Sequence, residues 1–165
     1  MLPTPMRKAA REITDPAQVW ALLDQASLLF LAMSQDDQPY VLPFNFGRVG
    51  EVIYLHTGHQ GLKIDVLRQN PRVSFSAVAE WSLIPGEPAC NWSIHSRSVV
   101  GFGRVRFVDD PAEKLAGLTA VTSHYAGPGP HQLGEKQVAA CQILAVEVAQ
   151  LFGKANPAPV AAPPA

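Results

Sequence analysis

The sequence predicts a mostly β protein, a small antiparallel barrel with peripheral helices. Six β-rich segments alternate with only three helical segments, and short turns join most of them. The chain has 165 residues, of which 47% are apolar and 16% charged, so one domain with a substantial core is expected. The pattern alone favours a closed six-stranded barrel with the helices at its openings.

The predicted strands are rich in β-branched and aromatic residues and are bounded by turn residues. They span residues 27–34, 40–47, 52–57, 72–81, 97–108 and 141–154. The turn "RVGE", with Gly50, joins the second strand to the third as a hairpin. Gly101 and Gly103 in the fifth strand indicate a bulge or a close approach of backbone.

Three helices are predicted, over residues 14–26, 61–70 and 109–126. The first has Thr14 or Asp15 as its N-cap, and the third has Asp109 or Asp110. The second ends at Asn70, because the residue before a proline leaves the helical region. The spacing of apolar residues in the third helix predicts that one face is lined by Leu115, Leu118, Val121 and Tyr125.

The chain ends differ from the block between them. Residues 1–10 are expected to form a flexible arm, and residues 154–165, "KANPAPVAAPPA", an extended Pro/Ala-rich tail. Residues 11–153 form the predicted domain.

The charge balance argues against nucleic acid and membrane as partners. The net charge is −1, from 13 basic and 14 acidic residues, with no basic run and no apolar run long enough to span a bilayer. The N-terminus has no apolar signal-peptide region. Cys90 and Cys141 lie far apart and are interpreted as reduced thiols, so a cytoplasmic protein is expected.

Residues 54–71, "YLHTGHQGLKIDVLRQNP", place polar side chains between a predicted strand and a predicted helix. A metal site made by His56 and His59 is one interpretation, but a three-residue spacing on a strand points them to opposite faces, and no metal-binding motif accompanies them. An ordinary helix cap is another, with Thr57 or His59 accepting from free N–H groups of the helix.

A phosphate cradle accounts for more of these residues. A helix N-terminus offers free N–H groups and the positive end of the helix dipole, and Gly58 and Gly61 let the backbone approach a ligand. Thr57 supplies a hydroxyl group. Lys63 lies in the first helical turn, where a cation is unfavourable unless an anion is bound nearby. The Walker glycine–lysine motif is absent, so a cradle of another kind is predicted.

Four segments then carry a family resemblance: "PYVLPFNFG" at 39–47, "IYLHTGHQGLKIDVLRQNPRVSF" at 53–75, "ACNWSIHSRSVVGFGRV" at 89–105 and "DDPAEKLAGL" at 109–118. In order and spacing they resemble the FMN-binding split-barrel superfamily of pyridoxamine-phosphate oxidases. Within it, the chain resembles most the Nim-type group of nitroimidazole-resistance proteins. The resemblance implies a split β-barrel homodimer with FMN in two clefts at the subunit interface.

The resemblance also implies which residues meet the cofactor. The isoalloxazine ring is expected along the backbone of Pro43, Phe44 and Asn45. His56 and Thr57 are expected beside the ribityl phosphate, and Lys63 on the phosphate itself. Ser98 is expected to face the cofactor, which Trp92 and Arg97 approach from the same or the partner subunit.

Plainer interpretations of some residues stay open. Pro43 and Phe44 also suit the edge and the core of a barrel, and Trp92 suits a dimer interface. Arg104 and Arg106, two apart on one strand, fit a solvated stripe or an interface pair.

The implied activity is that of an FMN-dependent oxidoreductase passing electrons to a small acceptor, such as a nitroaromatic or quinone-like compound, with His56 as the candidate catalytic residue. The alternative is a non-catalytic module that holds haem or deazaflavin, for which His56, His59 and His95 are candidate axial ligands. A pyridoxamine-phosphate oxidase is less favoured, because the chain ends in "GKANPAPVAAPPA" rather than in an arginine-rich segment.

Overall fold

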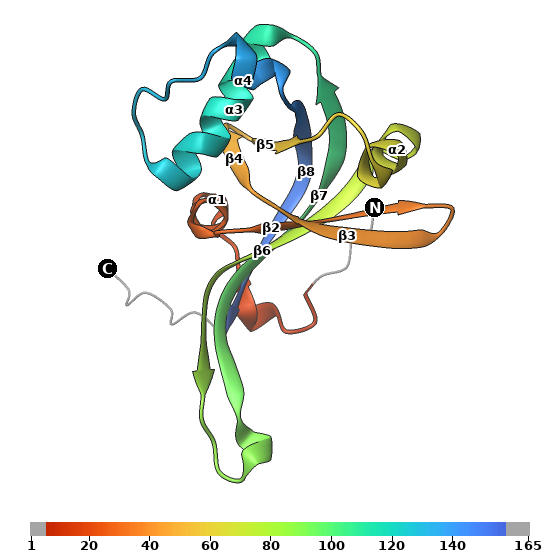
Figure 1. The fold of residues 1–165 in the computed structure, drawn as a ribbon. Helices are drawn as coiled ribbons and strands as arrows, with labels where there is room; N and C mark the ends of the chain where they lie inside the picture. The colour runs from red at the N-terminus through yellow and green to blue at the C-terminus, as the bar shows by residue number, and fades with distance from the viewer. Residues whose placement is uncertain (1–5, 158–165) are drawn as a thin grey trace.

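The computed structural model describes residues 6–157, which form a rolled antiparallel sheet with helices around it (Figure 1). The sheet order is β3-β2-β6-β7-β8-β5-β4, and a short β1 (Glu12–Ile13) pairs with β8. The main strands are β2 (Leu29–Gln35), β3 (Gln38–Phe44), β4 (Phe46–Val49), β5 (Val52–Thr57), β6 (Arg72–Ile84), β7 (Ser93–Val108) and β8 (Gln142–Asn156).

The sheet is split between β3 and β4, although these strands are consecutive in the chain. β3 pairs with β2 as far as Phe44, and β4 pairs with β5 from Phe46, so Asn45 belongs to neither ladder. With β3 and β4 taken as one bent strand, the six predicted strands are all present. The expectation of a closed barrel is wrong, because no ladder joins the two ends of the sheet within residues 6–157. The split barrel is confirmed.

Alternate residues of the strands face a common core. On β2 and β6 the inward-facing residues are Leu29, Leu31, Met33, Val73, Phe75 and Ala77. Two helices add apolar faces to this core: α1 (Pro16–Gln25) buries Val19, Leu22 and Leu23, and α2 (Leu62–Gln69) buries Val66 and Leu67.

The third helix, α3 (Pro111–Ala126), packs on the outside of β4 and β5, where a second apolar cluster includes Tyr54 and Val121. Leu115 and Tyr125, expected on its buried face, are 40% and 44% exposed. The helix instead packs through Gly117, which lies against the Tyr54 ring. A glycine contact brings the helix axis closer to the sheet than a leucine face allows.

The helix caps match one of the two candidates in each case. Asp15 accepts from the Ala17 N–H, and Asp110 accepts from the Ala112 and Glu113 N–H groups. Three short helices were not predicted: η1 (Ala9–Arg11), η2 (Ala89–Asn91) and α4 (Glu135–Ala139).

The chain ends are partly outside the described residues. Residues 1–5 of the predicted N-terminal segment and residues 158–165 of the predicted tail lie outside the described residues. The first three residues predicted for the tail, 154–156, are part of β8, which continues to Asn156 through pairing with β7. No helix among residues 6–157 is long and apolar enough to cross a membrane.

β6 and β7 continue beyond the barrel as a projecting hairpin (Figure 1). Sequence patterns place the strand ends at residue 81 and residue 97, but the ladder continues to Ile84↔Ser93. We refer to residues 80–96 as the arm.

Close packing of α3 predicts a strong effect at Gly47. A Cβ there would lie 2.2 Å from the Ala120 carbonyl carbon, a backbone atom that cannot rotate away. Gly47→Ala is expected to lower the free energy of unfolding by about 3 kcal/mol. Gly129→Ala is the control, since its Cβ meets nothing within 4 Å. Urea denaturation checks both variants, and equal stabilities would contradict the packing described here.

Candidate functional site

The end of β5 presents the first two candidate residues to opposite sides of the strand. His56 is exposed, whereas Thr57 is 9% exposed and is the one buried polar residue in the described part of the chain. Alternation along the strand explains this difference, because Ile53 and Leu55 point into the core with Thr57. His56 is therefore available to a ligand outside the barrel.

The turn after β5 leaves the start of α2 open. Gly61 is the N-cap with φ of 118°, and no side chain caps the helix. The expectation that Thr57 or His59 serves as the cap is therefore wrong. A Cβ at Gly58 or at Gly61 would meet nothing within 4 Å, so the surrounding space is free. The amides of Leu62 and Lys63, the first two of the helix, are not engaged by a cap.

The bent strand formed by β3 and β4 carries Pro43, Phe44 and Asn45, and it brings them beside this turn. The β4–β5 ladder ends at Phe46↔Leu55, and one further step of that register sets Asn45 opposite His56. The chain diverges there, because β3 pairs with β2. Pro43 is exposed and Phe44 is 7% exposed, so only Phe44 belongs to the core. The split thus opens where two sets of predicted site residues meet.

Lys63 makes no ion pair with any described residue, although it is half-buried on α2. Arg48 and Arg106, by contrast, are held by carboxylates: Arg48 by Asp24, and Arg106 by Glu113 and Glu147. A lysine at the positive end of a helix with no carboxylate partner favours an anionic ligand.

The remaining predicted residues are not all brought together. Ser98 and Arg97 are neighbours on β7 and so point to opposite faces of the sheet. Arg97 lines a hollow with Ile13 and residues of α1. Trp92 lies next to η2 at the tip of the arm and is 52% exposed. Figure 1 shows the arm and α2 at opposite ends of the molecule, so within one chain Trp92 does not join the β5–α2 turn.

The histidines have separate surroundings. His59 Nε2 lies 3.1 Å from the Ala139 carbonyl oxygen, and His95 Nε2 lies 3.7 Å from a Glu80 carboxylate oxygen. Among residues 6–157 no group of three or more His, Cys, Asp or Glu side chains is arranged to hold a metal ion.

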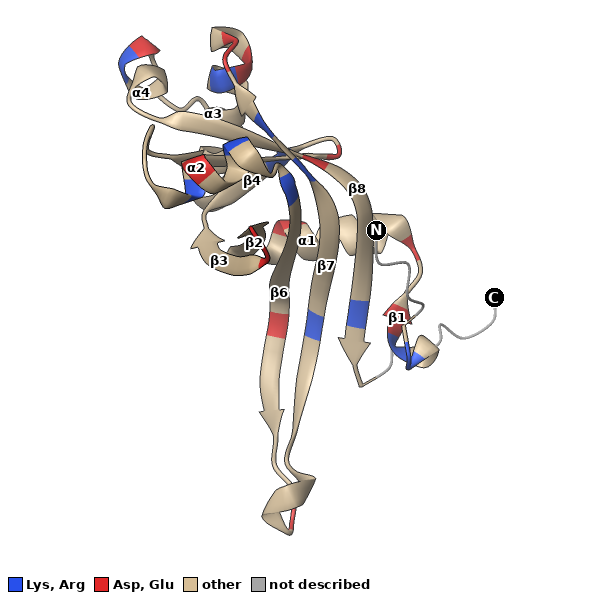
Figure 2. Cartoon of the chain, turned by 90° about the vertical axis from the view of Figure 1, so that its right-hand side faces the viewer, with Lys and Arg blue, Asp and Glu red and all other residues tan. Residues whose placement is uncertain are grey.

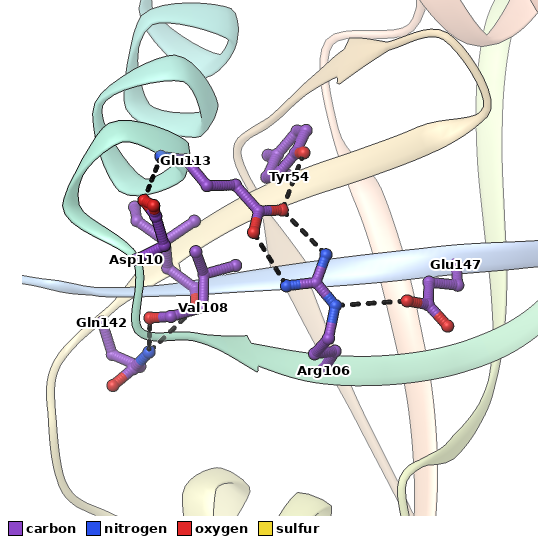
Figure 3. A network of polar contacts seen from close by, with 8 residues as sticks. Tyr54, Arg106, Val108, Asp110, Glu113, Gln142 and Glu147 are labelled. Atoms are coloured by element: carbon purple, nitrogen blue, oxygen red, sulfur yellow. Dashed lines mark hydrogen bonds and ion pairs between the residues drawn. The ribbon is translucent and has the colours of Figure 1, made fainter.

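A polar network fixes β5 two residues before His56 (Figure 3). Tyr54 donates its hydroxyl hydrogen to Glu113 on α3, over 3.1 Å. Arg106 of β7 donates two hydrogen bonds to the same carboxylate, over 2.7 and 2.9 Å, and a third to Glu147 of β8, over 3.1 Å. One guanidinium group therefore ties a helix and two strands to the strand that carries the site.

The network shifts the pKa values of Glu113 and Tyr54. Arg106 holds the pKa of Glu113 below its ordinary value through its hydrogen bonds, and the Tyr54 hydrogen bond acts in the same direction. Burial, followed by the hydrogen bond to Glu113, raises the pKa of Tyr54. The carboxylate form of Glu113 and the neutral form of Tyr54 are thus the stable ones at neutral pH.

Sequence reasoning missed this network and a second support. Tyr125 accepts from the Phe46 N–H over 3.2 Å and donates to the Ser27 carbonyl oxygen over 2.9 Å, which fixes the first residue after the split. Glu113 and Tyr54 are 59 positions apart in sequence, and Tyr125 and Phe46 are 79 apart. No local pattern signals such pairs. The only hint in the sequence is the pair Arg104 and Arg106, which fits a solvated stripe or an interface pair.

Comparison with protein families gives one match that spans most of the chain. The sequence model described as pyridoxamine 5'-phosphate oxidase matches residues 15–155. A comparison with curated proteins finds no match.

Solved structures share the fold. A candidate 5-nitroimidazole antibiotic resistance protein from Bacteroides thetaiotaomicron has a TM-score of 0.77 and 29% identity, over 87% of this chain and 86% of that chain. A FAD- and haem-binding protein from Mycobacterium smegmatis has a TM-score of 0.78 and 22% identity, over 92% and 77%. The flavocytochrome Anf3 from Azotobacter vinelandii has a TM-score of 0.75 and 22% identity, over 91% and 71%. The resemblance identified in the sequence is confirmed.

The lowered pKa of Glu113 predicts a pH-dependent contribution to stability. Because the folded pKa is below the ordinary value of 4.5, the ionised form stabilises the fold above that pH, and this stabilisation is lost as the pH falls through the folded pKa. Glu113→Gln is expected to cost about 1 kcal/mol at pH 7. The difference from the unsubstituted protein should shrink as the pH falls below 4.5 and through the lowered pKa of Glu113.

Urea unfolding at several pH values measures this contribution. Glu147→Gln is the matched control, because Glu147 accepts only one of the three Arg106 hydrogen bonds and its side chain is 57% exposed. An effect of Glu113→Gln that stays constant from pH 7 down to the acid limit of folding would show that ionisation of Glu113 does not contribute.

Proposed function

Because the chain belongs to the pyridoxamine 5'-phosphate oxidase family, we propose that it binds a flavin, specifically FMN. The proposed site is the split between β3 and β4, together with the neighbouring β5–α2 turn. The open, uncapped start of α2 beside the unpartnered Lys63 is the observation that carries this proposal. The names of two solved structures of the same fold add support, since they describe a FAD- and haem-binding protein and a flavocytochrome.

The residues of the β5–α2 turn fit the phosphate end of FMN. The free amides of Leu62 and Lys63 are donors, and the Lys63 ammonium group supplies the countercharge. Gly61 allows the left-handed backbone that the turn requires, with open space beside it. Thr57 contributes a hydroxyl group at the strand end.

The bent strand fits the ring end of the cofactor. Pro43 and Asn45 are exposed, and both lie where the sheet separates. Contacts from Phe44 are limited to its backbone, because its side chain is in the core. Ser98 faces the same side of the sheet as Pro43, as the ladders through Phe30, Ser76 and Val100 show.

A homodimer with the cofactor at its interface accounts for Trp92 and Arg97, which within one chain lie away from the other candidate residues. Trp92 and Arg97 do not face the β5–α2 turn of their own subunit, so in this proposal they approach the FMN of a second copy. In this arrangement the binding of FMN and the association of the two subunits depend on one another.

The proposed activity is a flavin-dependent oxidoreduction in the cytoplasm with a small electron acceptor, nitroaromatic or quinone-like. A bound flavin supplies the redox chemistry, and the protein supplies binding, orientation and electrostatics. His56 is the proposed catalytic residue. Its exposed imidazole lies beside the split, where it can donate a proton to an acceptor.

A non-catalytic module that holds haem or deazaflavin is the second candidate, favoured by the haem-binding name of one structure of this fold. His59 already contacts Ala139 and His95 contacts Glu80, which leaves His56 as the better axial ligand of the three. A double change of His56 and His59 to Ala that abolished haem binding but left FMN binding intact would favour this module.

An absorption spectrum of the purified protein, before and after FMN is added, is the first test. Bands near 375 and 450 nm, typical of oxidised flavin, that persist after desalting support the proposal. A Soret band, or no uptake of FMN, would contradict it. Steady-state reduction of nitroaromatic and quinone acceptors by the loaded protein then tests the activity.

Lys63→Ala is expected to weaken FMN binding by one to two orders of magnitude, about 1.5–3 kcal/mol, because a charge-assisted contact to the phosphate is lost. Lys8→Ala, at an exposed lysine of the N-terminal segment, is the matched control and should leave the Kd unchanged. Flavin fluorescence titration measures both. Riboflavin, which lacks the phosphate, should bind both variants equally; a Kd for FMN that Lys63→Ala leaves unchanged removes Lys63 from the site.

A further inference from the structure

A single tyrosine hydroxyl group joins the two sides of the split. Tyr125, in the last turn of α3, accepts a hydrogen bond from the Phe46 N–H over 3.2 Å and donates one to the Ser27 carbonyl oxygen over 2.9 Å. Phe46 begins β4, which pairs with β5, whereas Ser27 lies just before β2, which pairs with β3. The hydroxyl group therefore connects the two ladders that separate at Asn45. We call this pair of hydrogen bonds the bridge.

The bridge satisfies a backbone group that the sheet leaves without a partner. In an antiparallel ladder, every second residue directs its N–H group away from the neighbouring strand. Phe46 is such a residue, because its N–H group points to Tyr125 rather than to β5. β4 is at the end of the sheet order, so no further strand among residues 6–157 accepts from this N–H group. The tyrosine hydroxyl group takes the place of that strand.

His124 supports the bridge from the preceding position of α3. Its ring packs on the Phe46 ring, with the two centroids 4.4 Å apart, and its Nε2 lies 2.8 Å from the Ala26 carbonyl oxygen. Because a carbonyl oxygen only accepts, Nε2 carries the hydrogen. Two consecutive side chains thus connect Phe46 to residues 26 and 27, the link between α1 and β2.

The hydroxyl group is the main contribution of Tyr125 to the fold. The side chain is 44% exposed and belongs to neither apolar cluster. Its effect is on the backbone around Asn45. Phe44, on one side, is held by its pairing with Leu29, and Phe46, on the other side, is held by the bridge. Both ends of the short segment at the split are therefore fixed.

We propose that Tyr125 is a positioning residue for the flavin ring, because it holds the split at one width and so sets the backbone of Pro43 and Asn45. This inference rests on the proposed function, which places the ring along these two residues. Tyr125 acts through Phe46 rather than by touching the cofactor. Contacts to backbone groups depend steeply on alignment, so a small change in the width of the split weakens them.

The bridge differs from the phosphate contact in charge. Of the Lys, Arg, Asp and Glu residues, α3 has only Glu113 and Lys114, both in its first turn (Figure 2). The bridge at the other end is made by a neutral hydroxyl group and two backbone groups. Lys63 and a phosphate are ions, whose attraction is screened by salt. The effect of the bridge on flavin binding should therefore not depend on salt, whereas the effect of Lys63 should fall as salt is added.

Tyr125→Phe removes the bridge and keeps the ring of the side chain. Fluorescence titration with FMN and with riboflavin measures the result. Both dissociation constants are expected to rise by the same factor, about 10-fold, because the bridge positions the ring that the two ligands share. Lys63→Ala should weaken the binding of FMN alone. For FMN, the double variant should show the product of the two factors, since the two contacts lie at different ends of the ligand.

Tyr40→Phe is the matched control. Tyr40 lies on β3, packs against the core, and has a hydroxyl group that bonds to no other residue in the described part of the chain. The same chemical change there should leave both dissociation constants unchanged. The absorption bands of the bound flavin add a second readout. They should shift in Tyr125→Phe, because contacts with the protein tune the ring, whereas a loss of general stability would leave them in place.

Amide hydrogen exchange tests the bridge without any flavin. In the protein without cofactor, Tyr125→Phe is expected to speed the exchange of the Phe46 N–H about 10-fold, because its hydrogen bond is lost. The N–H of Leu55, a buried residue of β5 that pairs with β8, should exchange at an unchanged rate. Nuclear magnetic resonance resolves the two amides.

The outcomes separate this inference from the proposed function. Unsubstituted protein that binds neither flavin contradicts the proposed function and the positioning role together. If it binds both flavins, and Tyr125→Phe leaves the riboflavin dissociation constant unchanged or weakens FMN alone, only the positioning role is overturned. An equal loss in Tyr40→Phe has the same meaning. Unchanged exchange at Phe46 overturns the bridge itself, whatever the protein binds.

Discussion

The fold depends on one strand that has to pair in two directions. Residues 38–49 form a single stretch of extended chain, but its first half pairs with β2 and its second half with β5. Both ladders cannot continue through Asn45, so the sheet separates there. The split leaves exposed backbone and side chains beside the start of α2. A regular closed barrel would have paired these groups and left no room for a ligand between the two elements.

Keeping the split in one shape requires support from outside the sheet. α3 approaches β4 and β5 closely because Gly47 and Gly117 offer no side chain at the contact. From that position Tyr125 bonds the first residue after the split, and Glu113 joins Tyr54 to Arg106. Small residues set the distance, and the polar contacts then fix the position of β5. The strands that carry most of the candidate site are therefore held in place by α3.

Local patterns predicted the strands and helices well, because alternation, caps and turns are properties of neighbouring residues. They failed wherever the outcome depends on distant ones. The closed barrel was wrong because ladder pairing at Asn45 is decided by β2 and β5 together. Leu115 was placed on a buried face because leucine usually packs, whereas Gly117 makes the contact here. The pattern itself predicts the open turn with Gly58 and Gly61 and, beside it, Thr57 and Lys63; of its alternatives, a cap by Thr57 or His59 is wrong. The other candidate site residues come from the resemblance.

The low charge content of the sequence has a structural counterpart on the outer side of the sheet, where the exposed apolar residues are Phe30, Val41, Val78, Trp81, Leu83, Ile94 and Val100. With 16% of residues charged, a chain of this size has few groups with which to cover a broad sheet face, and half of the large apolar residues that are exposed lie on one side of it. The bulge after Val78 extends this side onto the arm at the cost of a regular ladder. A free hairpin gains nothing from such alignment. A covering surface changes that, because Trp81, Leu83 and Ile94 all face the same side of the hairpin.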